Sequence, residues 1–217
     1  MKKRIGIFGG TFNPIHLGHV KAAVEVQNIF ALDKVLFIPS HIPPHKGSSD
    51  MAAPLHRLEM VKLATASYPQ FIPSAMEIEA DGKSYSILTL SKLKKRYPDA
   101  WIFFILGIDA FLEIDTWRDY KKVLEQCHFI VISRPGYHLE DAKNVLGGKH
   151  KTRMQWVSDS ERIEEEVFER CRIFLLSIPT LDLSSCEVRR RIKHRESIAG
   201  QVAEPVEAYI NKNKLYQ

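Results

Sequence analysis

Cysteine and long apolar runs are the two features that this sequence has least of. It contains 3 cysteines in 217 residues (Cys127, Cys171 and Cys186), and no two of them stand at CxxC spacing. An odd number without that spacing argues against a disulfide framework and a zinc ribbon. The longest apolar stretch, WIFFILGI, is far too short to span a bilayer, and MKKRIGIFGG lacks the apolar core of a signal peptide. We therefore expect a cytoplasmic protein that does not bind a membrane.

Charge of one sign is not in large excess either. The 31 Lys and Arg residues against 26 Asp and Glu residues leave a net charge of +5. This balance is compatible with nucleic acid, with nucleotides or simply with a solubilising surface. Hydrophobic residues make up 45% of the chain and charged residues 26%, which is typical of globular proteins and excludes extended disorder. The length predicts a single domain over residues 1–217.

Apolar runs bounded by Gly or Pro alternate with helical patterns along the chain. The runs predict strands at residues 4–8, 34–39, 100–107, 128–133 and 172–178, and a weaker run predicts a short strand at 75–80. Helical spacing predicts helices at residues 20–29, 54–64, 86–97 and 184–194. This order predicts an α/β fold: a Rossmann-like, doubly wound parallel sheet with helices on both faces. Ligands of such sheets bind outside the carboxyl ends of the strands.

One stretch follows neither pattern. Residues 138–170 are polar and show no clear period until their end. We predict an insertion or a mobile segment there.

The stretch GGTFNPIHLGH, residues 9–19, joins the first predicted strand to the first helix. Gly9 and Gly10 let the backbone approach a ligand closely, and His16 and His19, three residues apart, fall on the same side of a first helical turn. The N–H groups and dipole of that turn favour an anion, and two imidazoles can add hydrogen bonds to phosphoryl oxygens. The patterns GxGxxG and GxxxxGK(S/T) are absent, and no HExxH completes a zinc site. We predict a phosphate site that holds no metal through the protein itself.

A second anion-binding pattern, LSSCEVRRR, lies far along the chain. Ser184 and Ser185 are candidate N-caps of a helix, and Arg189, Arg190 and Arg191 follow one turn later. Hydroxyls, helix N–H groups and an arginine together can hold phosphate oxygens. Three consecutive arginines point in three directions, so we expect at most two of them to face the phosphate.

Taken together, GGTFNPIHLGH and LSSCEVR resemble the paired signature of the nucleotidyltransferases with an (H/T)xGH motif. Within that superfamily the sequence is most similar to the bacterial nicotinate mononucleotide adenylyltransferases, because IPPHK, SYSILTL, GID, TWRDY and SRPG follow in the same order. The resemblance runs from Arg4 to about Ile192, interrupted by the polar segment. Asn13 departs from it where Asp is common, as do Ser86 and Cys186 where Thr is common. Cys186 lacks the hydroxyl that would bind a phosphate oxygen.

The resemblance implies an adenylyltransferase that moves AMP from ATP to nicotinate mononucleotide, giving nicotinate adenine dinucleotide and pyrophosphate in NAD biosynthesis. ATP and nicotinate mononucleotide are then the partners, with Mg²⁺ on the phosphates and no nucleic acid, and a homo-oligomer is possible. The residues implied as catalytic are His16, His19, Lys46 and Arg189. Those implied in ATP binding are Gly9, Gly10, Thr11, Phe12, His16, His19, Gly107, Asp109, Ser184, Ser185 and Arg189. Those implied in mononucleotide binding are Asn13, Lys46, Tyr85, Ser86, Trp117 and Arg134.

Individual roles follow from the same resemblance. The two histidines face the α-phosphate, Asp109 accepts hydrogen bonds from the ribose hydroxyls, and Trp117 stacks on the nicotinate ring. Lys46 neutralises a substrate phosphate, with a solvated loop lysine as the alternative. Arg134 either supports the site or simply ends its strand.

Competing interpretations remain open. Nicotinamide mononucleotide or phosphopantetheine could be the acceptor, although the phosphopantetheine enzymes are shorter and lack the SYS and TWRDY pieces. A different class is a non-catalytic nucleotide- or RNA-binding protein. Against it, the sequence has no RNP-like aromatic strand and no KH-type loop.

Overall fold

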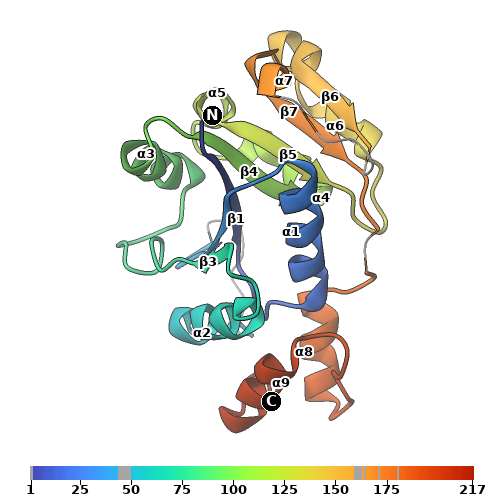
Figure 1. Ribbon diagram of the computed structural model, residues 1–217. Coiled ribbons are helices and arrows are strands. Elements are labelled where there is room, and N and C mark those ends of the chain that lie inside the picture. Colours follow the sequence, from blue (N-terminus) through green and yellow to red (C-terminus); the bar gives the residue numbers. More distant parts are fainter. Residues whose placement is uncertain (1, 44–49, 159–162, 164, 171, 180) are drawn as a thin grey trace. The chain divides into compact units, whose positions relative to one another are not determined.

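The computed structural model describes residues 2–43, 50–158, 163, 165–170, 172–179 and 181–217. Within these residues seven strands form one sheet in the order β3-β2-β1-β4-β5-β7-β6 (Figure 1). The strands are β1 (Arg4–Gly10), β2 (Lys34–Pro39), β3 (Phe71–Pro73), β4 (Trp101–Gly107), β5 (His128–Ile132), β6 (Met154–Val157) and β7 (Ile173–Leu176).

The pairings along the centre of the sheet are parallel: β1 with β4, β4 with β5, β5 with β7, and β7 with β6. Every residue of β5 and of β7 is buried. Such continuous apolar runs are typical of parallel strands that are covered on both faces. The predicted Rossmann-like parallel sheet is confirmed.

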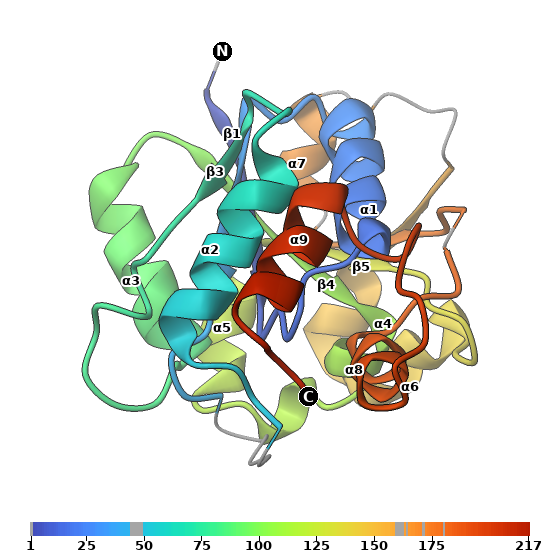
Figure 2. The same ribbon diagram turned by 90° about the horizontal axis from the view of Figure 1, so that it is seen from below.

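The α-helices that follow the strands include all four that were predicted from spacing. They are α1 (Leu17–Ile29), α2 (Pro54–Thr65), α3 (Ser86–Arg96), α4 (Ile108–Phe111), α5 (Tyr120–Gln126), α6 (Ala142–Val145), α7 (Glu165–Arg170), α8 (Ser185–Lys193) and α9 (Glu204–Lys212). Short 3₁₀ turns lie at η1 (Ile114–Thr116), η2 (Leu139–Asp141) and η3 (Gly148–Arg153). Figures 1 and 2 place α1 on one side of β1 and β4, and α3 with α5 on the other. No helix in the described part of the chain is both long enough and apolar enough to cross a membrane.

The chain divides into two compact units. The first comprises Met1–Phe8, Ala22–Val35 and Tyr85–Thr180, and the second comprises Gly9–Lys21, Leu36–Ser84 and Leu181–Gln217. In the second unit α2 packs against β3 and α9, and in the first α3 packs against α5. A single functional domain over residues 1–217 stays a prediction.

The strand predicted at residues 75–80 is wrong. This segment forms turns, and the short strand is β3, which ends at Pro73. The N–H of Glu79 donates to the carbonyl of Ala75, and the N–H of Ala80 donates to the carbonyl of Glu77. These local bonds occupy backbone groups that a sheet would need.

Several elements lie where no pattern predicted them, among them α5, β6 and α9. Within residues 138–170 the described part contains β6, which pairs with β7. In β6 only Val157 is buried, so the strand carries no apolar run for a sequence pattern to detect. Helix α9 follows the last predicted helix and buries Val206 and Ile210.

Candidate functional site

The loop between β1 and α1 carries the first phosphate motif and belongs entirely to the second unit. β1 ends at Gly10, whose carbonyl accepts a hydrogen bond from the N–H of Ser40 (2.9 Å). Phe12 follows with a φ of +48° and a buried side chain. Its ring meets the ring of His19 edge-on, with 5.2 Å between centroids. The loop therefore turns sharply at Phe12 and places the Phe12 ring in contact with the imidazole of His19.

His16 and His19 adopt a fixed mutual geometry at the start of α1. The N–H of His16 donates to Nδ1 of His19 at 3.2 Å, and the ring centroids are 3.7 Å apart. A side chain at the third helical position that accepts from the backbone N–H of the N-cap residue forms one half of a capping box. Since Nδ1 of His19 accepts, the neutral ring carries its proton on Nε2 and uses that atom as a donor.

Gly18 lies between the two histidines and makes room for them. A Cβ atom at this position would be 3.0 Å from Nδ1 and 3.1 Å from Cε1 of His16. Such distances are too short without movement of the imidazole. Gly18 is thus a sterically constrained position that the sequence analysis did not single out, although the pattern HxGH contained it.

Side chains from distant segments of the same unit bind the carbonyls of this loop. Arg189 Nη1 donates to the carbonyl of Asn13 (2.9 Å), and Ser185 Oγ donates to the carbonyl of Pro14 (2.8 Å). The structure therefore brings the two sequence-predicted phosphate patterns together. Arg189 Nε is buried and has no hydrogen-bond partner among the described residues, so this guanidinium keeps donor capacity beside the loop.

The neighbouring residues of α8 have other partners. Ser184 is the N-cap, and its hydroxyl accepts from the N–H of Glu187 (3.1 Å). Arg190 pairs with Glu187 and Glu196, and Arg191 pairs with Glu187. These ion pairs hold the pKa of the Glu187 carboxyl at about 2, through the hydrogen bonds from Arg190 and then Arg191. Of the three consecutive arginines, Arg189 is the one that contacts the loop.

Asn13 has both the oxygen and the nitrogen of its side-chain amide hydrogen-bonded within the protein. Its Oδ1 accepts from the N–H of Ala52 (2.9 Å) and from the hydroxyl of Tyr216 (2.8 Å), and its Nδ2 donates to the carbonyl of Asp50 (3.0 Å). The peptide bond between Asn13 and Pro14 is cis. The amide uses both its donor and its acceptor, so an Asp here would lose the bond to the carbonyl of Asp50.

Arg57 of α2 is a second residue that the sequence analysis missed. Its side chain is 0% exposed, and burial lowers the pKa of the guanidinium. It donates to the carbonyls of Ala52 (3.0 Å), Thr11 (2.7 Å) and His41 (3.0 Å). The sequence did contain a signal for its burial. Arg57 has the helical spacing of the apolar residues Val61 and Ala64, which are buried on the same face of α2.

The first unit contains a separate group of predicted residues at the end of β4. Gly107 ends the strand, and Asp109 lies in the first turn of α4. Asp109 Oδ2 accepts from Arg134 Nη1 (2.8 Å), whereas Oδ1 is buried and has no hydrogen-bond partner in the described part of the chain. Arg134 therefore orients this carboxylate, and one of the carboxylate oxygens keeps its accepting capacity.

Four of the six residues predicted for the mononucleotide lie in the same unit: Tyr85, Ser86, Trp117 and Arg134. The Trp117 ring is half-buried and meets Phe104 of β4 edge-on at 5.8 Å. Ser86 is the first residue of α3, and Tyr85 precedes it as the N-cap with no side-chain cap hydrogen bond. The Arg118 guanidinium lies 4.9 Å from the centre of the Tyr85 ring. Lys46 lies outside the described residues.

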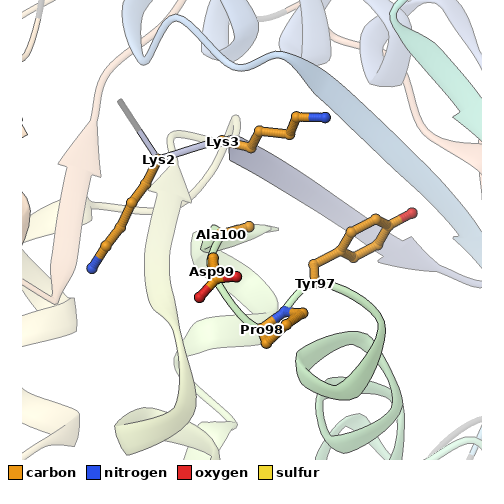
Figure 3. Close-up of a pocket in the computed structure, with 6 residues that line it drawn as sticks. All are labelled: Lys2, Lys3, Tyr97, Pro98, Asp99 and Ala100. Atoms are coloured by element: carbon orange, nitrogen blue, oxygen red, sulfur yellow. The ribbon is translucent and has the colours of Figure 1, made fainter.

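Among the described residues, no three His, Cys, Asp or Glu side chains are grouped so that they could hold a metal ion. A cavity of about 540 Å³ in the first unit is lined by Lys2, Lys3 and residues 97–100 (Figure 3). Its two lysine side chains point away from each other, and Lys2 Nζ lies 4.5 Å from the Trp101 ring centre. This cavity therefore lacks converging charges for an anion.

Comparison with known proteins agrees with this arrangement of motifs. Residues 7–191 match the Cytidylyltransferase-like family. A Desulfatibacillum aliphaticivorans protein named "Probable nicotinate-nucleotide adenylyltransferase" is 39% identical over 98% of this chain and 99% of its own length. A Moorella thermoacetica protein of the same name is 40% identical over 99% of this chain and 92% of its own length.

The fold has solved counterparts. A Plasmodium falciparum nicotinic acid mononucleotide adenylyltransferase complexed with NaAD matches with a TM-score of 0.73 and 20% identity, over 99% of this chain and 97% of the other. The same enzyme complexed with APC matches with a TM-score of 0.71 and 19% identity, over 99% of this chain and 97% of the other. These solved structures have the same fold as this chain. The curated relatives are similar to it in sequence over nearly its whole length. The chain therefore belongs to the Cytidylyltransferase-like family, in the group that contains the nicotinate-nucleotide adenylyltransferases.

Proposed function

We propose that this protein transfers the adenylyl group of ATP to nicotinate mononucleotide and releases pyrophosphate. The phosphate of the mononucleotide attacks the α-phosphorus of ATP, a new P–O bond forms, and the bond to the pyrophosphate leaving group breaks. The product is nicotinate adenine dinucleotide. The observation that carries the proposal is the meeting of the His pair with Ser185 and Arg189 at one loop. Relatives of 39% and 40% identity that bear this activity in their names support it.

The chemistry needs positioning and charge stabilisation rather than a base. The attacking phosphate is already an anion, so no residue has to remove a proton from it. The Nε2 proton of His19 would donate to an oxygen of the α-phosphate as negative charge develops there. The fixed Nδ1 contact holds the ring in place for this task.

Arg189 and α8 would hold the rest of the triphosphate. The buried Nε–H of Arg189 has no hydrogen-bond partner among the residues that the structure describes. The N–H groups at the start of α8 add the positive end of a helix dipole. Ser185 would then act mainly through the loop, because its hydroxyl already donates to the carbonyl of Pro14.

In the first unit, the unpartnered Oδ1 of Asp109 would accept hydrogen bonds from the adenosine ribose. Trp117 would stack against the ring of the mononucleotide, with Tyr85 and Ser86 beside it. Lys46 keeps its proposed role of neutralising a substrate phosphate. Asn13 would contribute by shaping the loop, since its amide is already hydrogen-bonded within the protein.

We infer Mg²⁺ as the metal that accompanies ATP. The described residues offer cations and donors around the phosphate motif and no carboxylate cage. This donor set fits a magnesium ion held by the phosphate oxygens and water, as is usual for nucleotide-bound Mg²⁺. When bound, the ion would neutralise the phosphates and assist departure of pyrophosphate.

The test is a pyrophosphate-release assay with ATP, Mg²⁺ and each of three acceptors: nicotinate mononucleotide, nicotinamide mononucleotide and phosphopantetheine. We expect the fastest release with nicotinate mononucleotide and a dinucleotide product of the matching mass. Release with another acceptor alone would reassign the substrate. No release with any acceptor, together with salt-dependent retention of RNA, would favour the non-catalytic alternative.

A further inference from the structure

We propose that Tyr216 is a positioning residue for adenylyl transfer, acting through its hydroxyl on Asn13 and thereby on the loop that orients Arg189 and the histidines. Tyr216 lies beyond α9 and outside both phosphate motifs. This inference rests on the proposed function, because it assigns to Tyr216 an effect on that reaction. All residues in the argument belong to the second unit.

The amide of Asn13 is the point at which Tyr216 meets the loop. Oδ1 of Asn13 accepts from the Tyr216 hydroxyl at 2.8 Å and from the N–H of Ala52 at 2.9 Å. Asn13 is buried, with 6% of its surface exposed. A buried amide held by three hydrogen bonds has one orientation, and losing one bond releases part of that constraint.

The backbone of Asn13 continues directly to the catalytic groups. Its carbonyl accepts the hydrogen bond from Arg189 Nη1, and three residues later the N–H of His16 binds Nδ1 of His19. A displacement of Asn13 therefore moves the acceptor that anchors the Arg189 guanidinium. Reactions that depend on preorganised charge lose rate when such groups shift by fractions of an ångström.

The backbone of Tyr216 adopts an uncommon conformation. Its φ is +66°, in the left-handed region that is uncommon for aromatic residues. Burial raises the pKa of its phenol, so the hydroxyl stays protonated and remains a donor at neutral pH. The contacts of Tyr216 with the loop compensate for its backbone strain.

The experiment compares Tyr216→Phe with Tyr209→Phe in the full chain. Each change removes one phenolic hydroxyl from the same region. The Tyr209 hydroxyl lies 2.9 Å from Nδ1 of His56, which belongs to α2. We expect Tyr216→Phe to lower kcat about five- to tenfold, because the groups that the loop positions are less well preorganised. The KM for ATP should rise as well, through the displaced Arg189, but by a smaller factor than loss of Arg189 itself. Tyr209→Phe should keep the wild-type kcat.

A double-mutant cycle tests whether Tyr216 acts through Asn13. In an Asn13→Ala background, Tyr216→Phe should cost less than about twofold in kcat, because the acceptor is already gone. If Asn13→Ala does not fold, the comparison of kcat between Tyr216→Phe and Tyr209→Phe is by itself the test of whether Tyr216 is a positioning residue. Thermal unfolding of each variant separates catalysis from stability.

The outcomes are distinct. A Tyr216→Phe variant with a lower Tm and an unchanged kcat would overturn the inference and leave a structural role only. Equal kcat losses in both single variants would overturn it as well. A wild-type protein that forms no dinucleotide would instead reject the proposed function, on which the inference rests.

Discussion

The backbone N–H of His16 donates to Nδ1 of His19 at 3.2 Å. This bond selects the tautomer of His19 and directs Nε2 away from the backbone of the first turn. The edge-on contact with Phe12 at 5.2 Å restrains the ring from another side. The second histidine of the motif is thus a preorganised donor, and its geometry is set by the loop that leads into α1.

Replacing this donor should impair chemistry and leave the fold intact. We expect His19→Ala to lower kcat by about 10²–10³, the usual cost of removing one preorganised donor to a transition-state oxyanion. Pyrophosphate release under saturating ATP and mononucleotide measures it. The exposed His138, in the first unit, offers the control His138→Ala, which should retain full activity. Near-normal turnover by folded His19→Ala would contradict the assignment of His19.

Mutations of the three consecutive arginines should change the KM for ATP to very different extents. Arg189 contacts the loop at the carbonyl of Asn13, whereas Arg190 pairs with Glu187 and Glu196 on an exposed surface. Arg189→Ala should raise the KM for ATP by about 10- to 100-fold, because charge-assisted bonds to phosphate contribute on the order of 1.5–3 kcal/mol. The KM for the mononucleotide should rise less. A larger effect from Arg190→Ala would show that the wrong arginine has been chosen.

Gly18 should be required for activity more than for stability. A methyl group at this helix position raises helix propensity but would lie 3.0 Å from Nδ1 of His16. We expect Gly18→Ala to lower kcat about tenfold through displacement of the imidazole, with little change in Tm. At Gly147 an added Cβ meets no atom within 4 Å, so Gly147→Ala is the matched control and should keep kcat. Equal activity of the two variants would refute the steric argument.

The ion pairs of Glu187 should make the thermal stability of the protein depend on pH. Hydrogen bonds from Arg190 and Arg191 lower the pKa of its carboxyl from 4.5 to about 2 in the folded protein. A carboxylate with a depressed pKa contributes stability that is present above pH 4.5 and is lost as the pH falls toward 2. The Tm advantage of wild type over Glu187→Gln should therefore shrink across that window. Because the pairs are exposed, 0.5 M NaCl should reduce the advantage at neutral pH. An advantage that is independent of pH would contradict the role of these ion pairs.

Nicotinate mononucleotide should be preferred over nicotinamide mononucleotide. The two acceptors differ by a carboxylate against a neutral amide of nearly the same size. The N–H groups at the start of α3, near Ser86, satisfy a carboxylate but face the NH₂ of an amide with another donor, and Tyr85 provides no side-chain cap there. That mismatch costs roughly 1–3 kcal/mol, or about ten- to a hundredfold in kcat/KM. Stacking on Trp117 contributes equally to both acceptors. Equal specificity constants at saturating ATP and Mg²⁺ would reject the preference.

The sequence by itself determined the β–α order and the two phosphate motifs, because both depend on local features. Buried parallel strands need continuous apolar runs, and β4 and β5 consist of them. The glycines, the N-cap serine and the two histidines three residues apart each mark the start of a helix, and each of these signals spans only a few residues of sequence. Where the local signal was weak the prediction failed: residues 75–80 form turns, and β6 has a single buried residue.

Only the tertiary structure decided which side chains hold the loop. Helical phase separates Arg189 from Arg190 and Arg191 but does not say which of the three meets the carbonyl of Asn13. Arg57 binds the carbonyl of Thr11 across 46 positions of sequence, and Tyr216 binds Asn13 across 203. Hydrogen bonds over such separations depend on how helices pack, and packing is set by the whole core rather than by any short pattern. The groups predicted to bind phosphate therefore come from the eleven residues 9–19. The residues that hold this segment in place by hydrogen bonds lie far away in the chain.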